Sequence, residues 1–192
     1  MEIAILIIGL IYSIVLHELA HGYVAEKLGD FTPRYAGRLT LNPLAHLDPI
    51  GSFLVPLMTY LVGGFLIGWA KPVPINPLNF DNPNKGMALV AAAGPLTNIL
   101  IAIILALIYK ISIILGNPAY LILPLIRLNL VLAVFNLIPI PPLDGSKIFL
   151  RNLDIQTMIF LEQFGILLVF IVVYFAFPLI NLIVNFLFNI LV

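Results

Sequence analysis

The sequence contains no cysteine and very little charge. Without cysteine there are no disulfides, no thiolate metal ligands and no cysteine nucleophile, so any metal must bind to histidine, aspartate or glutamate. Charged residues make up 9% of the 192 residues, whereas an average soluble domain has roughly 25%. The nine basic and nine acidic residues are spread thinly and cancel. This distribution excludes a cationic patch for nucleic acid and a polybasic anchor for anionic lipid.

Hydrophobic residues, in contrast, account for 62% of the chain. Apolar runs long enough for a membrane helix, which needs about 20 residues, recur along nearly the whole sequence. We therefore expect an all-α polytopic membrane protein with five or six transmembrane helices in the lipid bilayer. It should form a single integral membrane domain over residues 1–192, with no large soluble domain.

Five hydrophobic segments are expected to enter or cross the membrane. They cover about residues 3–28, 53–69, 87–110, 120–138 and 157–192, and Pro178 would divide the last one in two. The first segment has no basic region before it and no cleavage site, so we interpret it as part of the mature protein rather than a signal peptide. Lys and Arg divide almost equally between the two sides, so charge does not decide the orientation.

Two connecting segments are rich in turn-forming residues. In residues 31–52, the alternating stretch Tyr35–Leu41 could form a small membrane-associated β-hairpin, or an extended loop, whose edge could receive an extended peptide. Asp48 is expected to be a cap or turn residue. The segment KPVPINPLNFDNPN at 71–84 is rich in Pro and Asn, and we expect an ordered cap there rather than a flexible linker.

The first hydrophobic span contains HELAH at residues 17–21. Because residues four apart lie on one helix face, His17 and His21 can bind the same metal ion. Glu18 then lies close enough to reach a water on that metal, as the general base of H-E-x-x-H metalloproteases does. Ionisable groups inside a membrane are costly and point to function, although a purely structural polar cluster is the alternative.

A catalytic zinc site usually has three protein ligands, and two positions compete for the third. Asp144 follows the prolines of PIPPLDG, which prevent a helix, and Gly145 would let the backbone turn so that the carboxylate faces inward. His46 in NPLAHLD is the competitor, either as a ligand or as a partner of the site from outside the ligand set. We expect Asp144 to be the ligand and one Zn²⁺ per chain.

Several asparagines lie within apolar segments. Asn129 and Asn136 can share a helix face, and Asn136 could bind an unwound substrate backbone or only tie two helices together. Asn181, Asn185 and Asn189 form one polar stripe, which favours hydrogen bonding between helices and is consistent with a homo-oligomer.

Two separated motifs resemble the site-2 proteases, the intramembrane zinc metalloproteases of peptidase family M50, and in particular their short members without a PDZ domain. These motifs are HELAH at 17–21 and NLIPIPPLDG at 136–145, which fits the family pattern N-x-x-P-x-P-x-L-D-G at every fixed position. AGPLTN at 93–98 is similar to the family's G-x-x-x-N/S/G segment. The resemblance covers about residues 10–150, so the catalytic core would be about 1–150, followed by C-terminal helices at about 157–192.

The resemblance implies an activity and a set of site residues. It implies a zinc metalloendopeptidase of the prokaryotic plasma membrane that cleaves transmembrane proteins within or near their membrane segments. The implied zinc ligands are His17, His21 and Asp144, with Glu18 as the catalytic acid/base and Asn136 as a contact to the substrate backbone. Two alternatives stay open: a non-catalytic relative that binds membrane helices, and a membrane metal transporter, which would need several ligand sets along a path.

Overall fold

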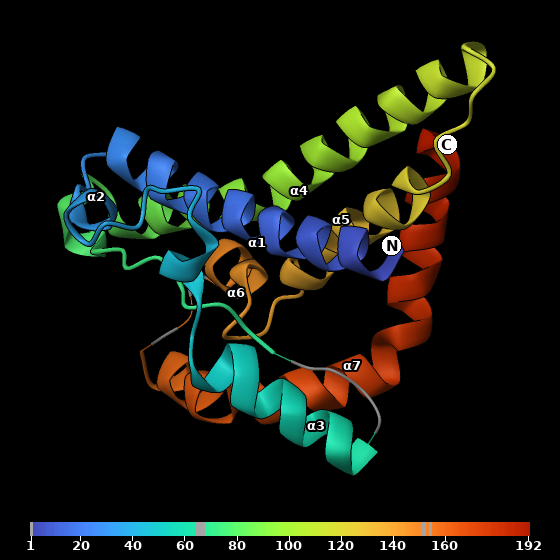
Figure 1. Cartoon of the computed structure of the whole chain (residues 1–192). Helices are drawn as coiled ribbons and strands as arrows, with labels where there is room; N and C mark the ends of the chain where they lie inside the picture. Colours follow the sequence, from blue (N-terminus) through green and yellow to red (C-terminus); the bar gives the residue numbers. More distant parts are fainter. Residues whose placement is uncertain (1, 64–67, 151–152, 154) are drawn as a thin grey trace.

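The computed structural model describes residues 2–63, 68–150, 153 and 155–192, and within these ranges the protein is all-helical. The α-helices are α1 (Glu2–Lys27), α2 (Thr32–Tyr35), α3 (Val55–Gly63), α4 (Pro83–Ile114), α5 (Ile122–Asn136), α6 (Asp144–Phe149) and α7 (Ile155–Leu191). The connections contain the 3₁₀ turns η1 (Pro43–His46) and η3 (Pro77–Asn79) and the π-helical turn η2 (Ile50–Leu54). As Figure 1 shows, α4 crosses α1, and it also packs against α5 and α6, while α5 packs against α7.

Among the described residues, three helices are long and apolar enough to cross a membrane, namely Ile3–Lys27 in α1, the whole of α4, and Tyr174–Leu191 in α7. These helices fit an integral membrane protein. Two shorter apolar helices, Ile50–Leu61 and Ile122–Asn136, do not reach the length of about 20 residues that a span needs. The predicted all-α class is confirmed for the described residues, but the count of five or six spans is not. Residues 64–67 of the predicted second span lie outside the described residues.

The hydrophobic core lies where α4, α5 and α7 meet. Ala102 of α4, Ile126 of α5 and Val184 of α7 are fully buried there. Figure 1 shows α7 as two arms joined at a bend. Pro178, predicted as a break, lies inside this helix, where a proline removes one helical hydrogen bond and favours a kink.

The β-hairpin predicted for Tyr35–Leu41 is not confirmed, because these residues form a helix end, a turn and bends. Pro33 stands in the first turn of α2, and the chain leaves that helix through Gly37, whose φ of +66° suits glycine. The Arg38 side chain then donates to the backbone carbonyl of Ala45. Local turn chemistry therefore overrides the alternating pattern, and residues 36–42 form a loop, as in the alternative prediction of an extended loop, but with a turn and bends in it.

Residues 69–77, here called the strap, form an extended segment that ends in η3. Its backbone N–H groups bind four different parts of the fold: Trp69 donates to Gly51 O (3.0 Å), Lys71 to His46 O (2.8 Å), Val73 to Glu18 Oε2 (3.0 Å) and Asn76 to Asp30 Oδ2 (2.8 Å). The prediction of an ordered cap over residues 71–84 is therefore confirmed. Asp48 also caps as predicted, since its Oδ1 accepts from the N–H groups of Ile50 (3.0 Å) and Gly51 (2.6 Å).

The chain reverses between α5 and α6 through the predicted proline cluster. Three prolines within four residues remove several helical hydrogen bonds, so α5 ends at Asn136 and α6 begins at Asp144. Gly145, predicted to let the backbone turn so that Asp144 faces inward, is not among the glycines with positive φ, so a left-handed backbone is not what it supplies. A Cβ at this position would instead overlap the backbone carbonyls of Leu137 and Ile138. Glycine is needed here because α6 begins in close contact with the end of α5.

Candidate metal centre

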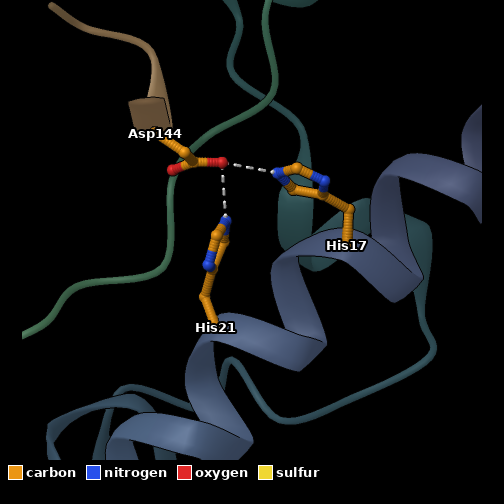
Figure 2. A group of neighbouring side chains, drawn as sticks. All are labelled: His17, His21 and Asp144. Atoms are coloured by element: carbon orange, nitrogen blue, oxygen red, sulfur yellow. Dashed lines mark hydrogen bonds and ion pairs between the residues drawn. The ribbon is translucent and has the colours of Figure 1, made fainter. Parts of the chain in front are cut away.

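His17 and His21 point from α1 toward Asp144, the first residue of α6 (Figure 2). Asp144 Oδ2 lies 3.1 Å from His17 Nε2 and 3.3 Å from His21 Nε2. One candidate ligand atom from each side chain lies within 4.8 Å of the others, and all three residues are buried. The fold therefore brings together the three residues that the sequence predicted, although His17 and Asp144 are 127 positions apart.

The second nitrogen of each imidazole is held by α4. His21 Nδ1 donates to the backbone carbonyl of Val90 (2.7 Å), which can only accept. His17 Nδ1 lies 2.5 Å from Asn98 Oδ1, and Asn98 Nδ2 donates to Asn129 Oδ1 (3.0 Å), so Asn98 Oδ1 acts as the acceptor. Both Nδ1 atoms therefore carry a hydrogen, and a neutral ring in this tautomer presents the lone pair of Nε2 to the centre of the group.

These residues fit a zinc ion. Two imidazole nitrogens and a carboxylate oxygen converge, and in the tautomers that the Nδ1 partners select no hydrogen lies between them, so a cation at the centre would satisfy all three acceptors. Two histidines and a carboxylate that leave the fourth position open are a ligand set of catalytic zinc. Gly94 of α4 provides the space, because a Cβ there would lie 2.5 Å from Nε2 of both histidines.

A cavity of about 550 Å³ opens beside the three residues. The cavity lining is mostly apolar and comes from α1, α4, α5, α6 and the strap. Besides His17, His21 and Asp144, the lining residues with charged or amide side chains are Glu18, Asn136 and Lys147. Glu18, the predicted acid/base, is half-buried and its Oε2 accepts from the N–H of Val73. Asn136, the predicted substrate contact, donates from Nδ2 to Leu132 O of its own helix (2.9 Å).

His46, the competitor for the third position, is not brought to the group. It does not line the cavity, and its Nε2 donates to the backbone carbonyl of Thr40 (3.0 Å). Its own backbone carbonyl accepts from the N–H of Lys71, which belongs to the strap. His46 therefore lies 2% exposed within the loop that supports the strap, and its link to the site is indirect.

Sequence reasoning missed the residues that support the histidines. Gly94 and Asn98 were recognised only as parts of a small-residue segment, although a glycine and an amide four apart share one helix face. That face contacts His17 and His21. The backbone partner of His21, Val90 O, and that of Glu18, Val73 N–H, carry no side-chain signal that could have identified them.

Comparison with known proteins gives several relatives. "Putative zinc metalloprotease YwhC" of Bacillus subtilis is 45% identical over 153 residues, which cover 74% of this chain and 66% of that protein. "Putative zinc metalloprotease Rip2" of Mycobacterium tuberculosis is 31% identical over 183 residues, which cover 91% of this chain and 68% of Rip2. "Putative zinc metalloprotease MJ0611" of Methanocaldococcus jannaschii is 32% identical over 177 residues, which cover 87% of this chain and 82% of MJ0611.

The chain belongs to this family of zinc metalloproteases. The family name agrees with the His17–His21–Asp144 group and with the zinc fit derived from it. The matched region spans just under two thirds of YwhC, at 66% of its length. No protein-family model matches the chain, and no solved structure matches it.

Proposed function

We propose that this protein is a zinc metalloendopeptidase of the site-2 type, family M50, that hydrolyses peptide bonds within or near transmembrane segments of other membrane proteins. The observation that carries the proposal is the convergence of His17, His21 and Asp144 with Glu18 on one cavity, built on helices long enough to cross a membrane. Membership in the zinc metalloprotease family supports the metal and the protease activity. The HELAH and NLIPIPPLDG motifs support the site-2 type.

In this proposal His17, His21 and Asp144 hold one zinc ion. When bound, zinc supplies a Lewis acid that polarises a peptide carbonyl and makes water more acidic. The α4 partners of the two histidines fix the hydrogen on Nδ1 and hold both imidazoles in line, so the Nε2 atoms are in place before the metal arrives.

Glu18 is the general base and then the general acid. It follows His17 in the sequence and lines the same cavity as the metal group, which supports this role. The carboxylate takes the proton of the attacking water and later gives it to the leaving amine nitrogen. Asn136, which also lines the cavity, would hold the substrate backbone by an amide hydrogen bond.

The substrate must present an extended backbone at this site. Carbonyls in a transmembrane helix are already hydrogen-bonded within the helix, so a substrate span has to unwind locally before its peptide bond can be attacked. The apolar lining of the cavity suits such a segment. The relatives come from bacteria and an archaeon, which supports the prokaryotic plasma membrane as the location.

A Glu18→Gln variant tests the proposal. The amide cannot act as a base, and we expect the cleavage rate of a reporter transmembrane substrate to fall by about 10²–10⁴-fold, while the bound zinc is retained. Glu26→Gln, an equal change on the same helix at a residue paired with Arg34, is the matched control and keeps its activity.

Three results would reject the proposal. Wild-type cleavage by Glu18→Gln would exclude Glu18 as the base. A wild-type protein that binds helical membrane peptides without cutting them would support the non-catalytic alternative, and zinc flux into liposomes without cleavage would support a transporter.

A further inference from the structure

The strap meets Glu18 through a single backbone group. The N–H of Val73 donates to Glu18 Oε2 at 3.0 Å. The residues on both sides, Pro72 and Pro74, have no N–H to donate. Within this part of the strap, Val73 is thus the one residue whose backbone can donate to the carboxylate.

Val73 contacts α1 at two points that are one helical turn apart. Its N–H binds Glu18, and its Cγ1 lies 3.4 Å from the position that a Cβ of Gly22 would occupy. Residues 18 and 22 share one face of α1. Because Val73 is only 6% exposed, both contacts are shielded from the surroundings, and the N–H is held in a fixed position relative to the helix.

The position of the strap does not depend on its bond to Glu18. The N–H groups of Trp69, Lys71 and Asn76 bind η2, η1 and the Asp30 carboxylate independently of it. The bond therefore acts mainly on Glu18, whose flexible side chain is confined to one orientation by a donor that is already anchored.

The bond engages only one of the two carboxylate oxygens. Within the described part of the chain, no hydrogen bond reaches Glu18 Oε1, and Glu18 forms no ion pair. Glu18 lines the cavity in which the substrate would lie. One oxygen is thus fixed by the strap, and the other is left to exchange a proton.

We propose that the backbone N–H of Val73 is a positioning group for the general base. It orients the Glu18 carboxylate through Oε2, so that Oε1 meets the attacking water and the leaving amine at the correct position. This inference rests on the proposed function. Val73 acts through Glu18 and contacts none of the three residues of the metal group through a hydrogen bond.

Two substitutions separate the N–H of Val73 from its side chain. Val73→Pro removes the N–H and keeps much of the apolar volume, whereas Val73→Ala keeps the N–H and removes the contact with Gly22. For the full purified chain loaded with zinc, kcat and KM are measured on a reporter transmembrane substrate, and zinc affinity is measured by competition with a chelator. We expect Val73→Pro to lower kcat about 10–100-fold with KM and zinc affinity unchanged, and Val73→Ala to retain most of the wild-type kcat.

A third variant removes the donor alone. Replacement of Val73 by its α-hydroxy acid turns the amide N–H into an ester oxygen and preserves the side chain. This ester variant tests the same hydrogen bond if Val73→Pro does not fold. The same fall in kcat is expected. The inference is overturned if the ester variant keeps its kcat, if Val73→Ala loses as much kcat as the ester, or if zinc affinity falls together with kcat. An inactive wild type would instead remove the proposed function, and this inference with it.

Discussion

Asn98 is the residue on which the orientation of His17 depends. It is fully buried, accepts from His17 Nδ1, and donates to Asn129 Oδ1 and, at 3.4 Å, to Ser13 O. One amide thus joins the ligand helix α1 to α4 and α5. Partners of this kind, which hold the outer nitrogen of a ligand histidine, typically contribute about 10–100-fold to metal affinity.

Removal of this amide should weaken zinc binding. In Asn98→Ala, His17 loses the acceptor of its Nδ1–H and Asn129 loses its donor, so we expect zinc affinity to fall by about 10–100-fold. Chelator competition on the purified protein measures this change. Asn185→Ala, an equal substitution at an exposed position of α7, should leave the affinity unchanged. Equal affinities for Asn98→Ala and the wild type would show that Asn98 does not orient the ligand.

The side chains that carry the chemistry could be predicted from the sequence, and their backbone partners could not. His17, Glu18 and His21 follow one helical spacing, and Asp144 stands in a proline-rich motif that restricts the backbone. Val90 O and Val73 N–H, by contrast, depend on how α4 and the strap lie against α1. Every residue offers a backbone carbonyl and every residue except proline an N–H, so no residue type identifies these groups.

Among the structural elements, the junction at Asp30 determines where the strap lies. Asp30 follows α1 and is fully buried, and its two oxygens accept four hydrogen bonds, from Thr32 N (3.1 Å), Thr32 Oγ1 (2.5 Å), Asn79 Nδ2 (2.7 Å) and Asn76 N (2.8 Å). Burial opposes ionisation of this carboxyl, but the hydrogen bonds outweigh it and hold its pKa below the ordinary value. The charged carboxylate thus ties the end of α1 to α2 and to the strap.

The lowered pKa predicts a contribution to stability that depends on pH. A carboxyl with a folded pKa below its unfolded value of about 4 stabilises the fold above that value, and this contribution is lost as the pH falls through the folded pKa. Asp30→Asn should therefore lower the melting temperature in detergent at pH 7, and its difference from the wild type should shrink below about pH 4. Asp81→Asn, at an exposed carboxyl, is the control. A difference that stays constant from pH 7 to pH 3 would contradict this account.

The long helices were more predictable than the connections. The extended apolar runs of α1 and α4 leave no other regular structure, because backbone polar groups in lipid must be satisfied within the segment. The stretch at 35–41 has strand-like alternation, yet Pro33 and Gly37 produce a helical turn and its exit. Alternation over so few residues is a weak signal beside Pro33, which fixes its own φ, and Gly37, which permits a positive φ.

Over the whole molecule, large apolar side chains cover much of the exterior. Ile7 of α1 is 53% exposed, Leu100 of α4 is 55% exposed and Phe186 of α7 is 64% exposed. Apolar patches of this extent on a protein surface mark contact with a membrane or a partner, and the three long helices favour the membrane. The exposed Asn185 and Asn189 remain consistent with the predicted homo-oligomer, since amides in lipid favour a partner.

The fold as a whole buries His17, His21 and Asp144 inside a protein whose exterior is largely apolar. Composition predicts the membrane class, and the two motifs predict the residues that meet, but the meeting itself depends on α4. Gly94 leaves space for both imidazoles, and α4 also packs against α6, which carries Asp144. The sequence contains no direct signal for that arrangement of three helices.

The central claim is that His17, His21 and Asp144 bind one zinc ion. The most direct test is zinc content combined with X-ray absorption at the zinc K edge for the purified full chain, for Asp144→Ala, and for Asp81→Ala as the control. We predict about one zinc per chain in the wild type and in the control, with two imidazole ligands at about 2.0–2.1 Å, and loss of most of the zinc in Asp144→Ala. A wild-type protein without zinc, or with zinc that has no imidazole ligands, would contradict the account.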